Sequence, residues 1–115
     1  PHLNYNRILL SEVLAGERRF EEITLNTREW YDQNKIDLRL GVRITAIDPL
    51  AKTVADSQGQ ITHYDRLLIA VGGTPFIPPI RGVEKQGVFV FRNLQVTLNI
   101  LEQARQTKHA IVIGG

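Results

Sequence analysis

The 115-residue sequence contains no cysteine and no methionine. Without cysteine, this segment can form no disulfide, no thiolate metal site and no redox dithiol. It also has little excess charge, because the formal net charge is only +2. The charges are scattered, and Arg18 and Arg19 form the only adjacent basic pair. This pattern lacks the basic stripe of a nucleic-acid-binding surface, so we expect no nucleic-acid partner.

Long apolar runs are also missing. None approaches the ~20 residues that a bilayer-spanning helix needs. The first seven residues are polar and lack the apolar core of a signal peptide. We therefore expect no membrane partner and a cytoplasmic protein. The three histidines, His2, His63 and His109, are far apart and lack metal-ligand spacing, so we predict no metal site.

Hydrophobic residues make up 43% of the chain, which is enough to build a packed core. Local signals predict a helix over 8–15 that stops at Gly16, followed by a linker through Phe20 and Ile23. A second helix is predicted from an Asn26 N-cap, with Glu29 in its first turn, to about Asn34. A third helix follows an Asn93 cap, with one apolar stripe of Val96, Ile100, Leu101 and Ala104.

The remaining apolar segments are typical of strands. Alternation predicts half-buried strands over 36–40 and 42–47, and turn residues predict a hairpin between 53–55 and 61–64. Residues 67–71 are apolar at every position, as in a parallel strand buried on both faces. Further strands are predicted over 88–91 and 109–113. This order of elements indicates the middle of a doubly wound sheet.

Two of these predicted strands end in glycine pairs, at 72–73 and 114–115. Small residues let the backbone approach a ligand closely, and doubly wound sheets bind ligands at the carboxyl ends of their strands. The run from His109 to Gly115 is typical of a strand that enters a phosphate-cradling loop. For the strand that ends at 72–73, composition alone favours a simple core strand followed by a tight turn.

Longer motifs carry a resemblance to a known family. "YDRLLIAVGGTPFIPPIRG", Tyr64 to Gly82, resembles the strand motif of the FAD-dependent pyridine nucleotide oxidoreductases, and "YNRILLSEVLAGE", Tyr5 to Glu17, resembles their flavin-contacting segment. With "LNTREWYDQNKIDLRLG", the whole chain is most similar to the N-terminal flavin region of the large subunits of assimilatory NAD(P)H nitrite reductases. The implied fold is α/β: a partial FAD/NAD(P)-binding, Rossmann-like domain of the three-layer ββα type, a fragment without its first βαβ unit.

The resemblance also implies a domain division. Residues 1–108 correspond to the middle and C-terminal part of the FAD-binding region. Residues 109–115 correspond to the first strand and truncated glycine loop of the NAD(P)-binding domain. We therefore expect the sequence to be the stretch between two nucleotide-binding loops.

Site residues follow from the same resemblance, and no catalytic residue is among them. The implied FAD-binding residues are Arg7, Ile44 through its backbone, Ala70, Val71, Gly72 and Arg92; the implied NAD(P)-binding residues are Gly114 and Gly115. Without the motif, Arg7 reads as a solvated loop arginine and Ile44 as a strand-core side chain. Arg92 stands near a helix start, where a cation is unfavourable, so we expect it to have a local partner.

Two positions depart from the family pattern. Val71 replaces the usual threonine, so any hydrogen bond from that hydroxyl is lost. Glu12 follows Ser11, where relatives that reduce ferredoxins often carry lysine.

The implied function is electron transfer from NAD(P)H through FAD to iron–sulfur and sirohaem centres that reduce nitrite to ammonia, with those centres outside this segment. The alternatives are a stand-alone rubredoxin or ferredoxin reductase, and a non-catalytic nucleotide-binding or interaction domain. Expected partners are a nicotinamide nucleotide, a small nitrite reductase subunit, and a second copy of the chain paired through an exposed sheet edge.

Overall fold

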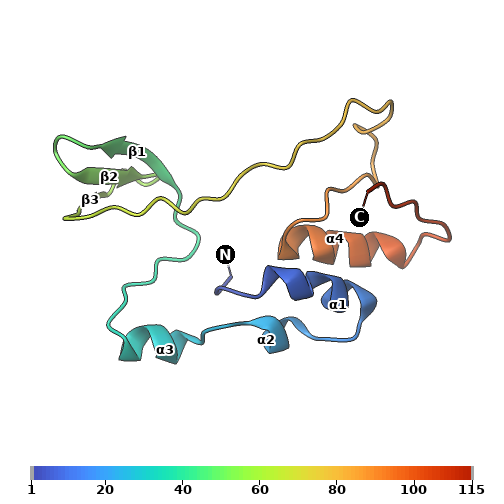
Figure 1. Cartoon of the computed structure of the whole chain (residues 1–115), viewed down its shortest axis with the longest axis horizontal. Helices are drawn as coiled ribbons and strands as arrows, with labels where there is room; N and C mark the ends of the chain where they lie inside the picture. The colour runs from blue at the N-terminus through green and yellow to red at the C-terminus, as the bar shows by residue number, and fades with distance from the viewer. Residues whose placement is uncertain (1, 115) are drawn as a thin grey trace. The chain divides into compact units, whose positions relative to one another are not determined.

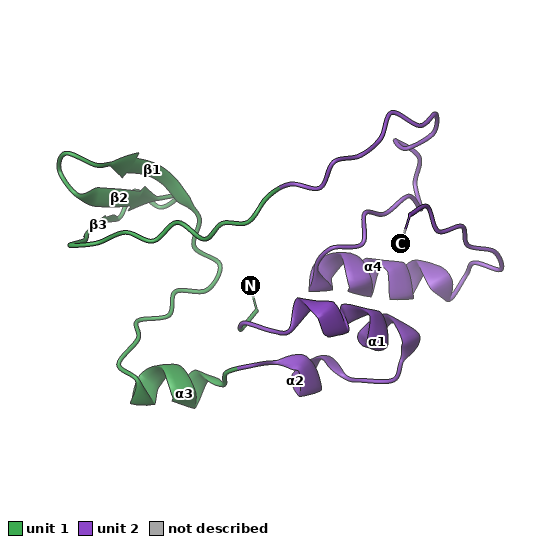
Figure 2. Cartoon of the chain, viewed as in Figure 1, with its two compact units in different colours: residues 1–3, 26–73 green, residues 4–25, 74–115 purple. Residues whose placement is uncertain are grey.

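The computed structural model describes residues 2–114 (Figure 1). Gly115, one of the predicted NAD(P)-binding residues, lies outside the described residues. The chain divides into two compact units (Figure 2). The first unit comprises residues 26–73 and the N-terminal residues up to Leu3, and the second comprises residues 4–25 and those from Thr74 onward.

An antiparallel sheet of three strands forms the centre of the first unit, in the order β1 (Ile44–Asp48), β2 (Thr53–Asp56) and β3 (Ile61–His63). The predicted hairpin is therefore confirmed. The carboxylate of Asp56 stabilises its turn by accepting hydrogen bonds from the backbone N–H groups of Gln58 (2.8 Å) and Gln60 (2.9 Å). The predicted strand over 42–47 is found at β1, with a register shift between Ile44 and Ala46.

The helix of the first unit, α3 (Arg28–Gln33), begins one residue later than predicted. Thr27, not Asn26, is the N-cap, and its hydroxyl accepts from the N–H of Trp30 at 3.4 Å. Threonine and asparagine both cap helices, so neighbouring candidates cannot be separated from sequence alone. The predicted strand over 36–40 is wrong, because these residues form no ladder. Arg39 instead donates to Asp37 (2.8 Å) and to the Thr62 hydroxyl (3.1 Å).

The second unit begins with a 3₁₀ turn, η1 (Arg7–Leu9), and continues into α1 (Leu10–Ala15). Together these confirm the predicted helix over 8–15. Gly16 ends it in the left-handed conformation at φ 77°, which side chains other than glycine adopt at a cost. The predicted linker is wrong at α2 (Phe20–Ile23). There the Glu22 carboxylate accepts from the backbone N–H of Arg19 (2.6 Å) and supports a single helical turn.

The last helix, α4 (Leu94–Ala104), starts at the predicted cap, since Asn93 Oδ1 accepts from the N–H of Val96 at 3.0 Å. The predicted apolar stripe is only partly buried. Its first three members are half-buried, whereas Ala104 is exposed. The fully buried residues of α4 are Leu94 and Thr97. The buried face therefore lies in the first turn of the helix and differs from the predicted stripe.

The core of the second unit joins segments from both ends of the chain. Its buried hydrophobic residues are Leu10 and Val13 of α1, Ile23 of α2, and Leu94 of α4. Tyr5, Leu9 and Phe20 pack around them, and the rings of Tyr5 and Phe20 meet edge to face with centroids 5.5 Å apart. The core thereby holds residues 4–25 against α4.

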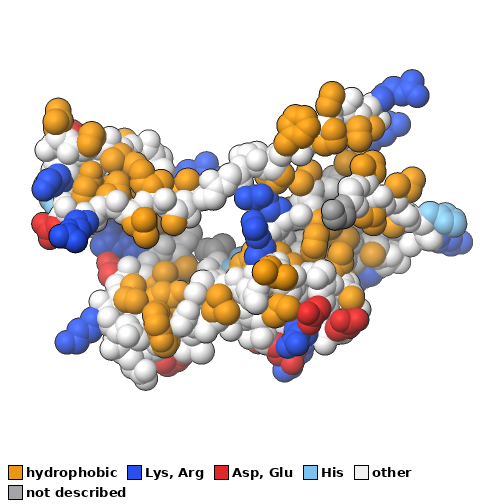
Figure 3. Space-filling model, viewed as in Figure 1, with side chains coloured by type: hydrophobic (Ala, Val, Ile, Leu, Met, Phe, Trp, Pro, Cys, Tyr) orange, Lys and Arg blue, Asp and Glu red, His pale blue; other side chains and the backbone are white. Residues whose placement is uncertain are grey.

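Three predicted strands are wrong: residues 67–71, 88–91 and 109–113 are coil (Figure 1). Their side chains are largely exposed, as at Leu68 (89%) and Ile111 (89%), and hydrophobic side chains lie on the surface in Figure 3. Apolar composition favours an extended, buried segment, but a strand also needs a neighbour for its backbone hydrogen bonds. Within residues 2–114, no strand pairs with these segments.

The longest helix among residues 2–114 is α4 with 11 residues, and none of the described helices could span a bilayer.

Candidate functional site

An open hollow of about 280 Å³ in the second unit brings together two residues that the sequence motifs singled out. Arg7 and Arg92 line it with Leu10 and Phe91. The two arginines come from opposite ends of the chain, and the folding of α1 against α4 places them at one site. The hollow is therefore the candidate functional site.

Local capping fixes each arginine. Asn6 Oδ1 accepts from the N–H of Ile8 at 3.1 Å and starts the 3₁₀ turn, whose first residue is Arg7. Arg92 stands immediately before the Asn93 cap of α4. Leu10 is only 1% exposed, so the apolar lining is continuous with the core. Both charges are thus attached to backbone that short-range hydrogen bonds hold in place.

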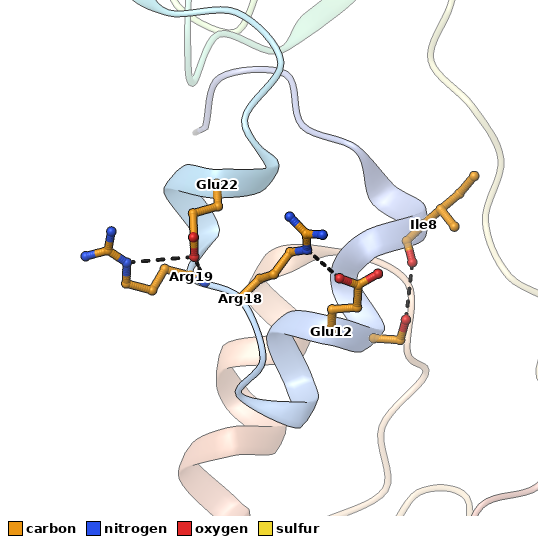
Figure 4. Close-up of polar contacts among 6 residues, drawn as sticks. Ile8, Glu12, Arg18, Arg19 and Glu22 are labelled. Carbon is orange, nitrogen blue, oxygen red and sulfur yellow. Dashed lines mark hydrogen bonds and ion pairs between the residues drawn. The ribbon is translucent and has the colours of Figure 1, made fainter.

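The charges of Arg7 and Arg92 are not neutralised by any carboxylate among residues 2–114. Three other arginines of the second unit are paired: Arg18 with Glu12, Arg19 with Glu22 at 3.8 Å (Figure 4), and Arg105 with Glu102 at 2.7 Å. Arg81, which does not line the hollow, has no carboxylate partner among residues 2–114 either. The hydrogen bond to Glu12 raises the pKa of Arg18. The expected local partner of Arg92 is therefore not found among the described residues, and this expectation was wrong.

Two uncompensated guanidinium groups at one hollow create a positive potential, and the N-terminal end of α4 adds to it. Guanidinium forks bind carboxylate and phosphate oxygens through paired hydrogen bonds. Phe91, which is 44% exposed, supplies apolar surface next to the charges, whereas Leu10 belongs to the buried core. This arrangement suits a ligand that carries both an anionic group and a planar or apolar part.

The other predicted FAD-binding residues belong to the first unit. Ile44 begins β1, and its side chain is 49% exposed, so the reading of a core side chain is wrong; its predicted role uses only the backbone. Ala70, Val71 and Gly72 lie in exposed coil. Gly72 has φ 70° and Gly114, in the second unit, has φ 87°. Both glycines have a positive φ, which glycine adopts at little steric cost.

Tyr5 belongs to the motif that resembles a flavin-contacting segment, but sequence reasoning gave its hydroxyl no role. Its hydroxyl accepts a hydrogen bond from the backbone N–H of Leu94 at 3.1 Å. Helix N-caps are normally found within three residues of the helix start. A phenol from the other end of the chain leaves no such local signal.

A larger hollow of about 480 Å³ lies elsewhere in the second unit, between residues 85–89 and α4. Lys85 and Glu102 both line it, so its charges are mixed, and it contains none of the predicted site residues. Within residues 2–114, no cluster of histidine, cysteine and acidic side chains could hold a metal ion.

Comparison with known proteins gives concordant results. The sequence model of a family described as pyridine nucleotide-disulphide oxidoreductase matches residues 1–115. The NAD(P)H nitrite reductase of Bacillus subtilis strain 168 is 45% identical over 115 residues, which are 100% of this chain and 14% of that protein. The assimilatory nitrate reductase electron transfer subunit of the same organism is 41% identical over 114 residues, which are 99% of this chain and 15% of that protein.

A chain of the covalent putidaredoxin reductase–putidaredoxin complex has a TM-score of 0.77 and 30% identity, over 89% of this chain and 25% of that chain. This likeness confirms the predicted fold class, a partial Rossmann-like α/β domain. The chain spans only a small part of each protein that it resembles.

Proposed function

The chain belongs to the pyridine nucleotide-disulphide oxidoreductase family, and on this basis we propose that it is the flavin region of an NAD(P)H nitrite reductase large subunit. The proposal is supported by relatives at 45% and 41% identity, which are a nitrite reductase and a nitrate reductase electron transfer subunit. The sequence contains no cysteine, so disulphide chemistry is not a function of this segment.

The observation that carries the proposal is the pair of uncompensated arginines at one hollow. FAD fits this donor set, because its diphosphate is anionic and its rings are planar and largely apolar. Arg7 and Arg92 would bind FAD through guanidinium hydrogen bonds, and the exposed ring of Phe91 would form an apolar wall beside it. When bound, FAD supplies the redox chemistry by accepting a hydride from the nicotinamide. These residues bind and orient it, and none of them transfers a proton.

The remaining sites are part of the same proposal. In it, the backbone of Ile44 and the coil of Ala70, Val71 and Gly72 contact FAD, while Gly114 and Gly115 begin the NAD(P)-binding loop. The proposed domain boundary stands at residue 108, before the segment 109–115. Sirohaem and an iron–sulfur cluster are placed outside this segment, in a cytoplasmic enzyme with a small subunit. A second copy of the chain is proposed to pair through an exposed sheet edge.

A stand-alone reductase of a ferredoxin-type protein is the second candidate. The 30% identity to the putidaredoxin reductase complex favours it, although the nitrite reductase relative is more similar. The two candidates differ in the acceptor, and so in the rest of the protein. A cysteine cluster with iron–sulfur and sirohaem absorbance in the whole protein supports nitrite reductase, and its absence supports the stand-alone reductase.

Binding of FAD to variants of the whole protein tests the proposed site. A charge-assisted hydrogen bond contributes about 1.5–3 kcal/mol, so Arg7→Ala and Arg92→Ala are each expected to raise the FAD dissociation constant about 10- to 150-fold. Arg105→Ala is the matched control, because Arg105 pairs with Glu102 and does not line the hollow. Calorimetric titration of the apoprotein with FAD measures all three. A wild-type protein that is colourless and does not bind added FAD would contradict the proposal.

A further inference from the structure

The segment that carries Arg7 and the segment that carries Arg92 are joined by a hydrogen bond close to both. The hydroxyl of Tyr5 accepts from the backbone N–H of Leu94 at 3.1 Å. Tyr5 precedes Arg7 by two residues, and Leu94 follows Arg92 by two residues. The hydrogen bond therefore lies two residues along the backbone from Arg7 and two residues from Arg92.

The tyrosine side chain is itself held in place. Its backbone forms an isolated antiparallel bridge with Thr24, and its ring packs edge to face on Phe20. Leu94 is the first residue of α4, and its N–H is one of those that a helix cannot satisfy internally. The hydroxyl thus satisfies an orphan donor from a rigid position.

Packing between α1 and α4 cannot fix the same geometry by itself. Hydrophobic contacts are non-directional and tolerate small shifts of one segment along another. Two like charges that line one hollow repel each other and favour such a shift. A directional hydrogen bond opposes this shift.

We propose that the Tyr5 hydroxyl is a positioning group, which holds Arg7 and Arg92 at the spacing that FAD requires. The inference rests on the proposed FAD site. Tyr5 does not line the hollow and acts on the cofactor through the two arginines.

The test substitutes Tyr5→Phe in the whole protein, because phenylalanine keeps the ring packing and removes only the hydroxyl. Loss of one hydrogen bond predicts a 2- to 12-fold rise in the FAD dissociation constant. The visible circular dichroism of the bound flavin is expected to change as well, since the arginines shift relative to it. Amide hydrogen exchange at Leu94 is expected to accelerate in the apoprotein.

Two control variants separate positioning from general stability. Tyr31→Phe removes a hydroxyl in the first unit and is expected to leave FAD affinity unchanged. Val13→Ala opens the core of the second unit without touching the hydrogen bond, so it lowers stability while the flavin dichroism stays that of wild type. If FAD affinity follows stability in all three variants, Tyr5 is merely structural and the inference is overturned.

A double variant adds a second criterion. If Tyr5 acts through Arg92, Tyr5→Phe changes FAD affinity less in an Arg92→Ala background than in wild type. Additive effects overturn the positioning role. Equal affinity of wild type and Tyr5→Phe overturns this inference alone, whereas a wild-type protein that does not bind FAD overturns the proposed function together with it.

Discussion

The core of the second unit predicts a large destabilisation for Ile23→Ala. Ile23 is 1% exposed and packs with Leu10, Val13 and Leu94. Truncation of a buried isoleucine to alanine costs about 2–5 kcal/mol, depending on how far the site can collapse. Here collapse is restricted, because the carbonyl of Ile23 accepts from the N–H of Asn6 at 2.8 Å and fixes the backbone. We therefore expect a value in the upper half of that range.

Native-state hydrogen exchange measures this loss where it occurs. The amide of Thr97 donates to the carbonyl of Asn93 and reports opening of the second unit. Ile23→Val is expected to lower the opening free energy measured at this amide by about 0.5–1.5 kcal/mol. Leu50→Ala is the surface control, because Leu50 is 96% exposed. A loss below about 1 kcal/mol for Ile23→Ala, or one equal to the Leu50→Ala value, would refute the assigned core.

Three further predictions concern local structure. Asn93→Ala removes the cap of α4 and is expected to lower the opening free energy, measured by hydrogen exchange at the Thr97 amide, by about 0.5–2 kcal/mol. Asn93→Asp keeps a hydrogen-bond acceptor and is expected to lower it less. Gly16→Ala forces a left-handed alanine and is expected to cost about 1–2 kcal/mol by thermal unfolding, although the site has room for a methyl group. The pKa of Glu29 is lowered by hydrogen bonds that its carboxylate accepts from the Glu29 backbone N–H and from Thr27. Its contribution to stability is therefore present above the unfolded pKa of about 4.3 and is lost as the pH falls through the lower folded value; carbon-detected NMR titration checks this, and Thr27→Val is expected to raise the pKa.

Local chemistry allowed the ends of several elements to be predicted from the sequence. Gly16 and Asn93 act on backbone within a few residues, so their roles are written in the adjacent sequence. The hairpin turn after β2 is equally local, because the carboxylate of Asp56 binds its own turn. In each case the structure and the sequence agree because the interaction spans a single turn.

Local sequence could not show whether residues 67–71 form a strand. Their apolar composition is a statement about burial, whereas a strand is defined by a partner that lies elsewhere in the chain. The same limit applies to the Tyr5 hydroxyl, whose donor is at the other end of the sequence. Such pairings require knowledge of the fold, and only family resemblance placed Arg7 and Arg92 in one site beforehand.

The charge pattern of the second unit gives a reason for that site which does not depend on resemblance. Glu12 and Glu22 neutralise Arg18 and Arg19. Arg7 and Arg92 line one hollow with no carboxylate partner among residues 2–114, although Arg92 stands at a helix start that disfavours a cation. An anion that binds at this hollow would neutralise the positive potential to which both guanidinium groups contribute. A diphosphate is such an anion, and the charge pattern therefore supports the proposed FAD site at this hollow.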